Sequence, residues 1–233
     1  MRDFWKKRHM EGLSNKRFVF GTIFFIIFIL LTTGSLGGWA RNYRLSQGYS
    51  NTIKILNEIM QITDYERDKT FTSGNLIQIY IVEALYSRYK GLDCRRNKSA
   101  QQCIEVTPYK TYNGNSDISE DIYSKGLSVA IGKVLLKFSS PKSPKDPVYI
   151  MADLNGAPEP PNRLGYDVFV FEIVDGKLKH EGDPVTSWPI ASNGFYCSPT
   201  STSKSDLQGV NCAYKLLTDK QYFKKLKYEK KKK

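Results

Sequence analysis

The hydrophobic pattern of the chain begins with one long apolar stretch. Residues 18–40, FVFGTIFFIIFILLTTGSLGGWA, contain no charged side chain. As a helix this stretch would reach about 34 Å at ~1.5 Å per residue, enough to cross the hydrocarbon core of a membrane. Farther on, Ile53, Leu56 and Ile59 recur at helical spacing between polar residues. No proline occurs between residues 18 and 62. The pattern therefore predicts a transmembrane helix that continues as an amphipathic helix.

A second helix and a set of strands are predicted for the remainder. Residues 74–91, GNLIQIYIVEALYSRYKG, are rich in apolar side chains, and a polar stretch separates them from the first helix. From residue 125 onward, short apolar segments alternate with polar residues, and Asp175-Gly176 is a typical hairpin turn. We therefore expect an α+β fold. Its long N-terminal helix, transmembrane and then amphipathic, would pack on one face of a C-terminal antiparallel β-sheet.

The formal net charge of +12 is concentrated at the two ends of the chain. Residues 1–17 carry six Lys or Arg against two acids, and residues 220–233 carry eight Lys against one acid. The chain between these ends is close to neutral. A lysine run at a chain end is usually a solvated tail, but it can also bind anionic lipid, envelope polymer or DNA. The candidate contacts are Lys230, Lys231, Lys232 and Lys233.

The order of basic and apolar segments predicts a location. Basic residues before an apolar span orient the N-terminus to the cytoplasm by the positive-inside rule. We expect a single-pass protein of the bacterial inner membrane, with contacts to lipid through residues 18–40 and a periplasmic or extracellular C-terminal domain. The alternative is a cleaved signal peptide with small residues at Gly38 and Ala40. The predicted parts are a cytoplasmic leader (1–17), an anchor (18–40), an exported domain (41–219) and a tail (220–233).

Four cysteines lie beyond the apolar stretch. Four cysteines allow three connectivities, and local pairing is favoured because short polar loops separate Cys94 from Cys103 and Cys197 from Cys212. An even number in an exported domain is typical of structural disulfides. Metal binding is the weaker interpretation, because the chain has no C-x-x-C motif.

The segment from Met151 to Gly182 raises the question of a metal site. Oxygen atoms of Asp153, Asn155 and Asp167 are the kind of ligand that Ca²⁺ prefers. The same residue types stabilise turns through local hydrogen bonds, and Gly156 can adopt a positive φ there. The spacing is not that of an EF-hand, so we expect a structural turn, with calcium as the competing hypothesis and no other cofactor.

Catalytic patterns are absent from the sequence. The chain has only two histidines, His9 and His180, and no glycine-rich phosphate loop follows a predicted strand. The sequence therefore favours a protein that is not an enzyme.

Several stretches in the C-terminal part of the chain resemble a family of bacterial proteins. ADLNGAPEPPNRLGYDVFVFEI, residues 152–173, is similar to the D-x-N-G…P-N-x-x-G-x-D-x-F-x-F segment of type IV pilins and pseudopilins with prepilin-type N-termini. The following DGKLKHEG, the cysteine loop from GFYC, and GVNCAYKLL also resemble that family. The chain lacks the usual prepilin cleavage motif and has no glutamate in residues 18–40.

The resemblance implies a structural or accessory subunit of a type IV pilus or a type II secretion-type assembly. Its partners would be other pilin-like or secretion-system subunits. The alternatives are an envelope binding module that does not polymerise, and a DNA-uptake pilin that uses the basic tail.

Overall fold

The computed structural model of the protein describes most of the chain beyond residue 36. The described ranges are 37–61, 74–104, 108–119, 126–140, 146–175, 177–190, 195–198 and 201–226, together with residues 19, 22, 23, 25 and 122. The chain divides into two compact units, Met1–Arg44 and Leu45–Lys233. In the first unit, the rings of Trp39 and Tyr43 stack with their centroids 5.6 Å apart. The sheet and its core belong to the second unit.

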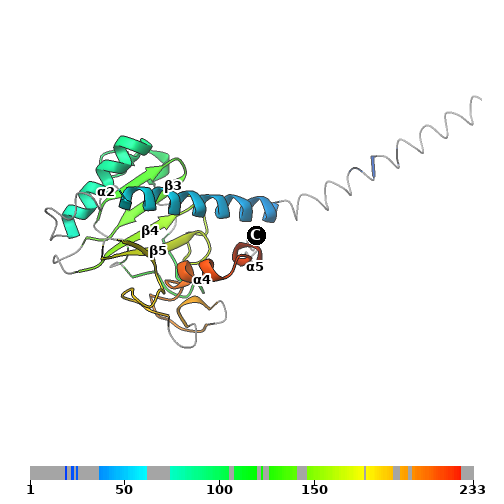
Figure 1. The fold of residues 1–233 in the computed structure, drawn as a ribbon. Coiled ribbons are helices and arrows are strands. Elements are labelled where there is room, and N and C mark those ends of the chain that lie inside the picture. The colour runs from blue at the N-terminus through cyan, green and yellow to red at the C-terminus, as the bar shows by residue number, and fades with distance from the viewer. Residues whose placement is uncertain are drawn as a thin grey trace, which may run out of the picture. The chain divides into compact units, whose positions relative to one another are not determined.

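Six strands form one antiparallel sheet in which sequence neighbours are also spatial neighbours (Figure 1). The order is β1-β2-β3-β4-β5-β6. The strands are β1 (Leu92–Asp93), β2 (Ser128–Ile131), β3 (Val134–Phe138), β4 (Val148–Asp153), β5 (Val168–Val174) and β6 (Lys177–His180). The predicted hairpin after β5 is confirmed, because Val174 pairs with Lys177 across it.

The sheet is accompanied by several helical segments. Residues 37–61 are helical, and the named helices are α2 (Gly74–Tyr89), α4 (Cys212–Thr218) and α5 (Tyr222–Lys225). Two 3-10 turns, η1 (Gln101–Cys103) and η2 (Phe195–Cys197), each include a cysteine. Helix α2 ends where Lys90 adopts a positive φ of 52° and the Gly91 N–H donates to the Leu85 carbonyl. This geometry satisfies a carbonyl that the helix end would otherwise leave without a donor.

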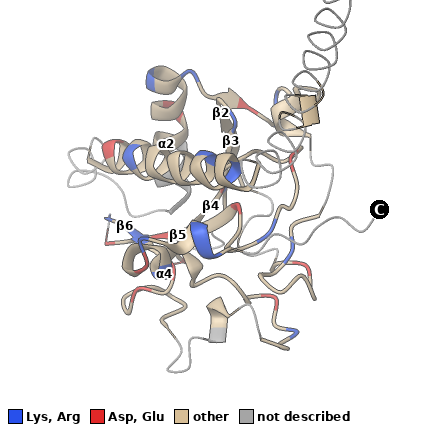
Figure 2. Cartoon of the chain, turned by 90° about the vertical axis from the view of Figure 1, so that its right-hand side faces the viewer, with Lys and Arg blue, Asp and Glu red and all other residues tan. Residues whose placement is uncertain are grey.

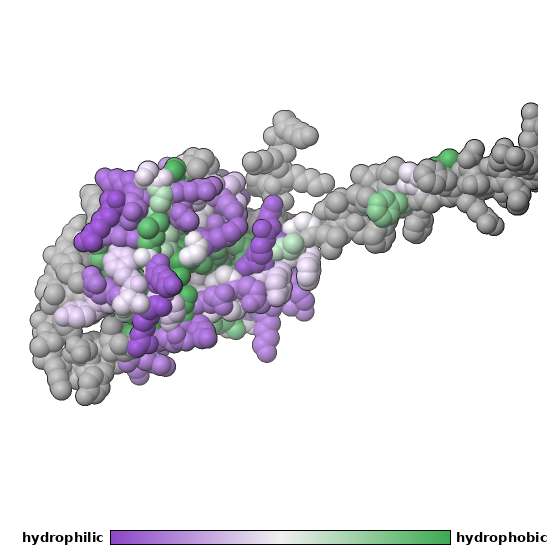
Figure 3. All heavy atoms as spheres, turned by 90° about the horizontal axis from the view of Figure 1, so that it is seen from above, coloured by the Kyte–Doolittle hydropathy of each residue, from purple (hydrophilic) through white to green (hydrophobic). Residues whose placement is uncertain are grey.

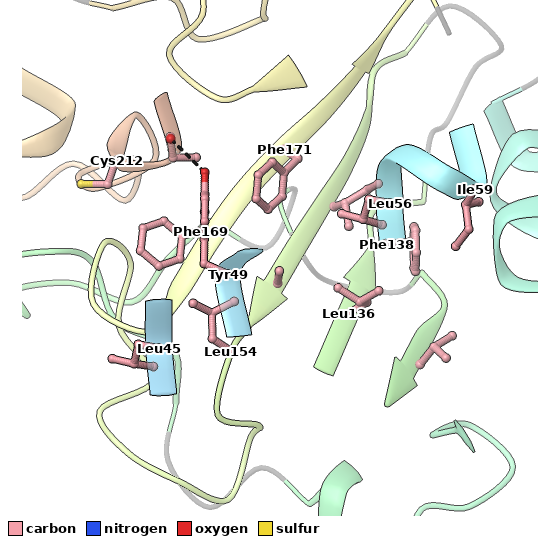
Figure 4. Packing of buried hydrophobic residues seen from close by; sticks show 14 of the residues in the cluster. Leu45, Tyr49, Leu56, Ile59, Leu136, Phe138, Leu154, Phe169, Phe171 and Cys212 are labelled. Carbon is pink, nitrogen blue, oxygen red and sulfur yellow. Dashed lines mark hydrogen bonds between the residues drawn. The ribbon is translucent and has the colours of Figure 1, made fainter. Parts of the chain in front are cut away.

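The first face of the sheet packs against helices. Tyr49 from the helical segment packs against Phe169 and Phe171 of β5, and Leu56 of the same segment lies beside Phe138 of β3 (Figure 4). The Tyr49 hydroxyl also donates to the Ala213 carbonyl in α4, at 3.3 Å. Side chains of α2 join the same cluster, among them Ile81, Val82 and Leu85. This cluster is the larger part of the hydrophobic core.

The second face of the sheet is covered by loops. Val168 and Val170 of β5 and Met151 of β4 pack there against buried apolar residues that lie outside the named helices and strands. Those residues are Tyr109, Ile118, Ile122, Leu164 and Val210. Every residue of β4 is buried, as expected for a strand that is covered on both sides.

The predicted fold class is therefore wrong. It expected a long N-terminal helix, transmembrane and then amphipathic, as the cover of a sheet with one buried face. The structure has a six-stranded sheet covered by several separate segments, and α2, α4 and α5 are short. The physical reason is that β4 and β5 carry apolar side chains on both faces, and one helix cannot bury both.

The predicted inner-membrane location is contradicted as well. Among the described residues, no helix is both long enough and apolar enough to cross a membrane. The helical segment that begins at residue 37 soon includes the charged residues Arg41, Arg44 and Lys54, which dilute its apolar character. Most of the predicted span 18–40 and the whole leader 1–17 lie outside the described residues.

The described surface is mixed in charge and hydropathy. Figure 2 shows Lys and Arg interspersed with Asp and Glu over the described elements, in keeping with the near-neutral middle of the chain. In the view of Figure 3, hydrophilic side chains dominate, and hydrophobic ones appear between them. The exposed large hydrophobic residues of the second unit are Tyr80, Ile104, Val185, Ile190 and Leu217.

Candidate functional site

The connection between β4 and β5 contains the three predicted calcium ligands. Asp153 is the last residue of β4, and Asp167 directly precedes β5. Both side chains are fully buried, and the Leu154 N–H donates to the Asp167 carbonyl across the connection, at 2.8 Å. The Asn155 side chain lies beside Asp167. The structure therefore brings Asp153, Asn155 and Asp167 together, as a metal site would require.

The carboxyl group of Asp153 is occupied by donors from the protein. Its Oδ1 accepts the N–H groups of Gly156 (2.9 Å) and Asn155 (3.3 Å). Its Oδ2 accepts the hydroxyl of Tyr109, at 3.0 Å, and the Lys137 ammonium lies 4.9 Å from the centre of the Tyr109 ring. Burial, and then the charge of Asp167, raise the pKa of Asp153 well above its usual value.

Asp167 binds the other end of the same connection. Its Oδ1 accepts the N–H of Arg163 at 2.8 Å, and its Oδ2 accepts the N–H of Asn162 at 3.0 Å. Burial raises the pKa of Asp167 to about 6, against the lowering effect of these N–H donors. The side-chain amide of Asn155 donates to the Glu159 carbonyl. These contacts support the structural interpretation, and calcium binding at the three residues stays a hypothesis.

Two glycines place this connection against its neighbours. Gly156 has a φ of +85°, and a side chain there would put its Cβ 2.5 Å from the Lys133 carbonyl oxygen. Gly165 has a φ of +75°, and its Cβ would lie 2.7 Å from the Cys212 sulfur. Each position therefore requires glycine for its backbone angle and for its lack of a side chain.

The acidic connection meets the C-terminal cysteine loop. The Gly165 carbonyl accepts the hydroxyl of Tyr222 from α5, at 2.8 Å. A Cβ at Gly209, which also has a positive φ, would lie 2.7 Å from the Leu164 side chain. The β4–β5 connection and the C-terminal segment therefore pack together, although Gly165 and Tyr222 are 57 positions apart in the chain.

The predicted disulfides are confirmed. Cys94 pairs with Cys103 across nine residues, and Cys197 pairs with Cys212 across fifteen. Cys212 is fully buried and belongs to the main core (Figure 4), whereas Cys94 and Cys103 are partly exposed beside the edge strand β1. The described residues contain no free cysteine.

A second pair of buried acids was not predicted. Glu172 of β5 and Glu181, directly after β6, are both buried, and their carboxyl groups are neighbours. The signal was present in the sequence, because strand alternation places Glu172 on the same face as Val168 and Val170. No local pattern pointed to Glu181 or to Tyr109.

Catalytic and metal-binding groups are sparse in the described part of the chain. His180 is largely buried between Tyr49 and Phe171, and this burial lowers its pKa to about 4. No cluster of three or more His, Cys, Asp or Glu side chains suited to a metal ion is found there. His9 and the predicted anionic-partner contacts Lys230–Lys233 lie outside the described residues.

Comparison with family models, with curated proteins and with solved structures gave no match to this chain.

Proposed function

We propose that this protein is a structural or accessory subunit of a type IV pilus or a type II secretion-type assembly, and that it has no enzymatic activity. The observation that carries the proposal is the contact between two of the pilin-resembling stretches. Gly165 of the acidic connection closely approaches Cys212 of the cysteine loop. Stretches that resemble the family and are distant in sequence therefore pack against each other at the β4–β5 connection.

The use of buried polar groups supports a non-enzymatic role. The carboxyl groups of Asp153 and Asp167 are fully buried and accept hydrogen bonds from the protein itself. A catalytic acid or base must be within reach of a substrate proton. These two groups are instead placed to fix a loop.

The two disulfides support a function in an oxidising environment. Structural disulfides persist in oxidising environments and are rare in the cytosol. The Cys197–Cys212 bond lies next to the acidic connection and so stabilises the same unit.

A non-polymerising envelope binding module is the second candidate function. It is favoured by the lack of a prepilin cleavage motif and of a glutamate in residues 18–40. In a pilin that glutamate neutralises the N-terminal amine of a neighbouring subunit, and a chain without it loses that contact. The two candidates therefore differ in whether the chain joins an assembly.

Deletion of the gene in its own host, with and without complementation, tests the proposal. We expect loss of surface filaments or of secreted substrate protein, restored by the full chain. Photo-crosslinking from Val185, Ile190 and Leu217, three exposed apolar positions, should then yield adducts with other subunits of that assembly. Exposed Lys98 provides the matched polar position. Normal filaments and normal secretion in the deletion strain would contradict the proposal and favour the binding module.

A further inference from the structure

Glu172 and Glu181 form a buried pair of carboxyl groups between β5 and the loop of residues 181–190. The Glu181 N–H donates to the Val170 carbonyl, which continues the β5–β6 ladder by one residue and places Glu181 beside Glu172. Glu181 has no exposed surface, and Glu172 is 5% exposed. The pair therefore lies inside the protein, on the face of the sheet that is covered by loops.

The two carboxyl groups have different partners. Both oxygens of Glu172 are occupied by Ser187, whose N–H donates at 2.6 Å and whose hydroxyl donates at 3.0 Å. Neither oxygen of Glu181 accepts a well-formed hydrogen bond from the described residues, and the nearby Thr186 hydroxyl and Gly182 N–H lower its pKa less than burial and Glu172 raise it. A buried carboxylate that lacks well-formed hydrogen bonds is costly to keep ionised. Protonation of Glu181 removes this cost, because burial penalises only the charged form.

A lysine lies next to the pair on β6. Lys179 is directly opposite Glu172, but its ammonium lies 4.0 Å from Asp183, on the same side of the sheet edge as the loop. His180, the next residue in β6, packs on the opposite face between Tyr49 and Phe171. The other titratable groups from packed elements are two phenols. Tyr149 lies opposite Glu172 on β4, and the Tyr214 N–H in α4 donates to the Glu181 carbonyl.

We propose that Glu172 and Glu181 share a single proton, and that this proton latches the loop of residues 181–190 to the sheet. The protonated Glu181 donates its O–H to the Glu172 carboxylate, which also accepts both groups of Ser187. One negative charge then has three donors, and no carboxyl oxygen is left facing a like charge. When the proton leaves, two buried carboxylates repel each other, and the contact between Ser187 and Glu172 weakens.

Trp188, in the same loop, can report whether the latch is closed. The Trp188 ring stacks on the Tyr149 ring of β4, with centroids 4.4 Å apart. Trp188 directly follows Ser187, so release of Ser187 frees the indole. Burial, together with the neighbouring Glu172, raises the pKa of Glu181 to about 9, which keeps the latch closed at neutral pH. Burial lowers the pKa of His180 to about 4, so His180 stays neutral over the same range.

Trp188 fluorescence in the full chain tests the latch. The chain has three tryptophans, so Trp5→Phe and Trp39→Phe leave Trp188 as the single emitter. Between about pH 6 and about pH 10, acrylamide quenching of Trp188 should increase about threefold as the loop opens locally. The midpoint should lie above neutral pH. Glu181→Gln should remove this transition and keep Trp188 protected, because its amide N–H replaces the shared proton as the donor to Glu172.

Two controls make the result specific. Glu159→Gln changes an exposed glutamate and should leave the transition unchanged. All variants retain Tyr149, Tyr214 and the Lys179–Asp183 pair, so any effect of those groups on Trp188 persists in Glu181→Gln. A transition that survives Glu181→Gln, or that is missing from the parent chain, overturns the proposal.

A second measurement needs no substitution at the pair. Carbon-13 labelling of glutamate side-chain carboxyls alone should reveal a neutral glutamate near pH 7.5, titrating together with the Trp188 transition; aspartates remain unlabelled. If all glutamates are ionised near pH 7.5, the shared proton is wrong.

A cation is the competing source of neutralisation. If millimolar calcium protects Trp188 at high pH in the parent chain and has no effect on Glu181→Gln, the site binds a cation and the proposal fails.

Discussion

Glycine conformations determine how closely the β4–β5 connection approaches its neighbours. Gly165 combines a left-handed backbone with close approach to Cys212 and Tyr112. Gly132, in the β2–β3 turn, has a φ of +59°, but no atom lies within 4 Å of the point that a Cβ would occupy there. A substitution at Gly132 therefore tests only the backbone angle, whereas a substitution at Gly165 tests the backbone angle and the close approach together.

Gly165→Ala should destabilise the protein more than Gly132→Ala. The left-handed angle alone costs an alanine about 1–2 kcal/mol, and this is the full effect expected at Gly132. At Gly165 the overpacking adds roughly 1–3 kcal/mol. Urea unfolding of the two variants and the parent chain measures both effects. Equal losses at the two positions would show that the close approach relaxes without cost.

The buried pair Asp153–Asp167 should make stability depend on pH in the acidic range. The folded-state pKa of Asp167, about 6, is higher than its ordinary value of 3.8. Between these two pH values the folded protein holds a proton that the unfolded chain has released. The free energy of unfolding therefore decreases as the pH rises, by about 1.4 kcal/mol per pH unit for each proton.

Asp153→Asn should reduce this slope by about one proton, because it removes one of the two interacting acids. The asparagine Oδ1 can still accept the Gly156 N–H, so the turn is retained. Unfolding by urea at several pH values between about 4 and about 6 gives the slope. Asp117→Asn, at an exposed acid, is the control and should leave it unchanged. A slope in Asp153→Asn equal to that of the parent chain would contradict the coupling.

The turn chemistry at these positions could be predicted from residue types, but their burial could not. Asp, Asn and Gly in close succession indicate local hydrogen bonds to the backbone, and the Asp153 contacts with Asn155 and Gly156 are of that kind. The Tyr109 contact joins residues 44 positions apart, and nothing local encodes it. A sequence pattern reports the neighbours of a residue in the chain and not its neighbours in the core.

The two disulfides lie in parts of the fold that differ in burial. Cys197–Cys212 connects η2 to the first residue of α4 inside the main core, whereas Cys94–Cys103 closes a loop next to the two-residue edge strand β1. Their removal should therefore have unequal effects.

Replacing Cys197 and Cys212 by alanine should cost more stability than the same change at Cys94 and Cys103. Each disulfide is typically worth about 2–4 kcal/mol, with the larger value for the longer loop. Loss of the buried Cys212 sulfur also opens space in the core. Thermal unfolding of the two double variants, without reductant, compares them. A larger loss for the Cys94–Cys103 variant would contradict the ranking.

The β4–β5 connection should not require calcium. Its two carboxyl groups already accept N–H and O–H donors, which a cation would have to displace. A ligand that binds only the folded state raises the melting temperature by mass action. We expect equal melting temperatures in EGTA and in millimolar calcium. A calcium-dependent rise that disappears in Asp153→Asn would establish the calcium hypothesis instead.

Strands could be predicted better than the layers that cover them. Alternation in residues 166–174 and the Asp175-Gly176 turn predicted β5, β6 and their pairing. The loop layer on the second face has no periodicity, since Tyr109, Leu164 and Val210 come from separate irregular segments. Such a layer is held by contacts between distant residues, and these leave no regular pattern in the sequence.

The folded part of the second unit includes residues that the lysine content had assigned to the tail. The lysine content of residues 220–233 predicts a basic tail, but Tyr222 and Phe223 are buried in the main core. Phe223 contacts the rings of Tyr49 and Phe169, and the Tyr222 hydroxyl donates to the Gly165 carbonyl.

Two truncations distinguish the folded part from the tail. A chain ending at Leu226 should keep the parent melting temperature and lose salt-sensitive retention on an anionic resin, because it lacks five lysines. A chain ending at Asp219 should be destabilised by about 3–5 kcal/mol or more, the usual cost of removing a large buried aromatic side chain. Thermal unfolding and resin binding of both chains give the answer. Equal stability of the two truncated chains would contradict the placement of α5 in the core.

The order of strands in the sheet also affects how the chain folds. Each strand pairs with the strand that precedes it in sequence, although the β1–β2 connection (residues 94–127) and the β4–β5 connection (residues 154–167) are long. A chain that emerges from a ribosome or a translocation channel can add one strand at a time, without waiting for a distant partner. The Tyr222–Gly165 contact closes last, because it requires the C-terminus. Until then, the apolar side chains of β5 that α4 and α5 will cover remain open to other proteins, including chaperones.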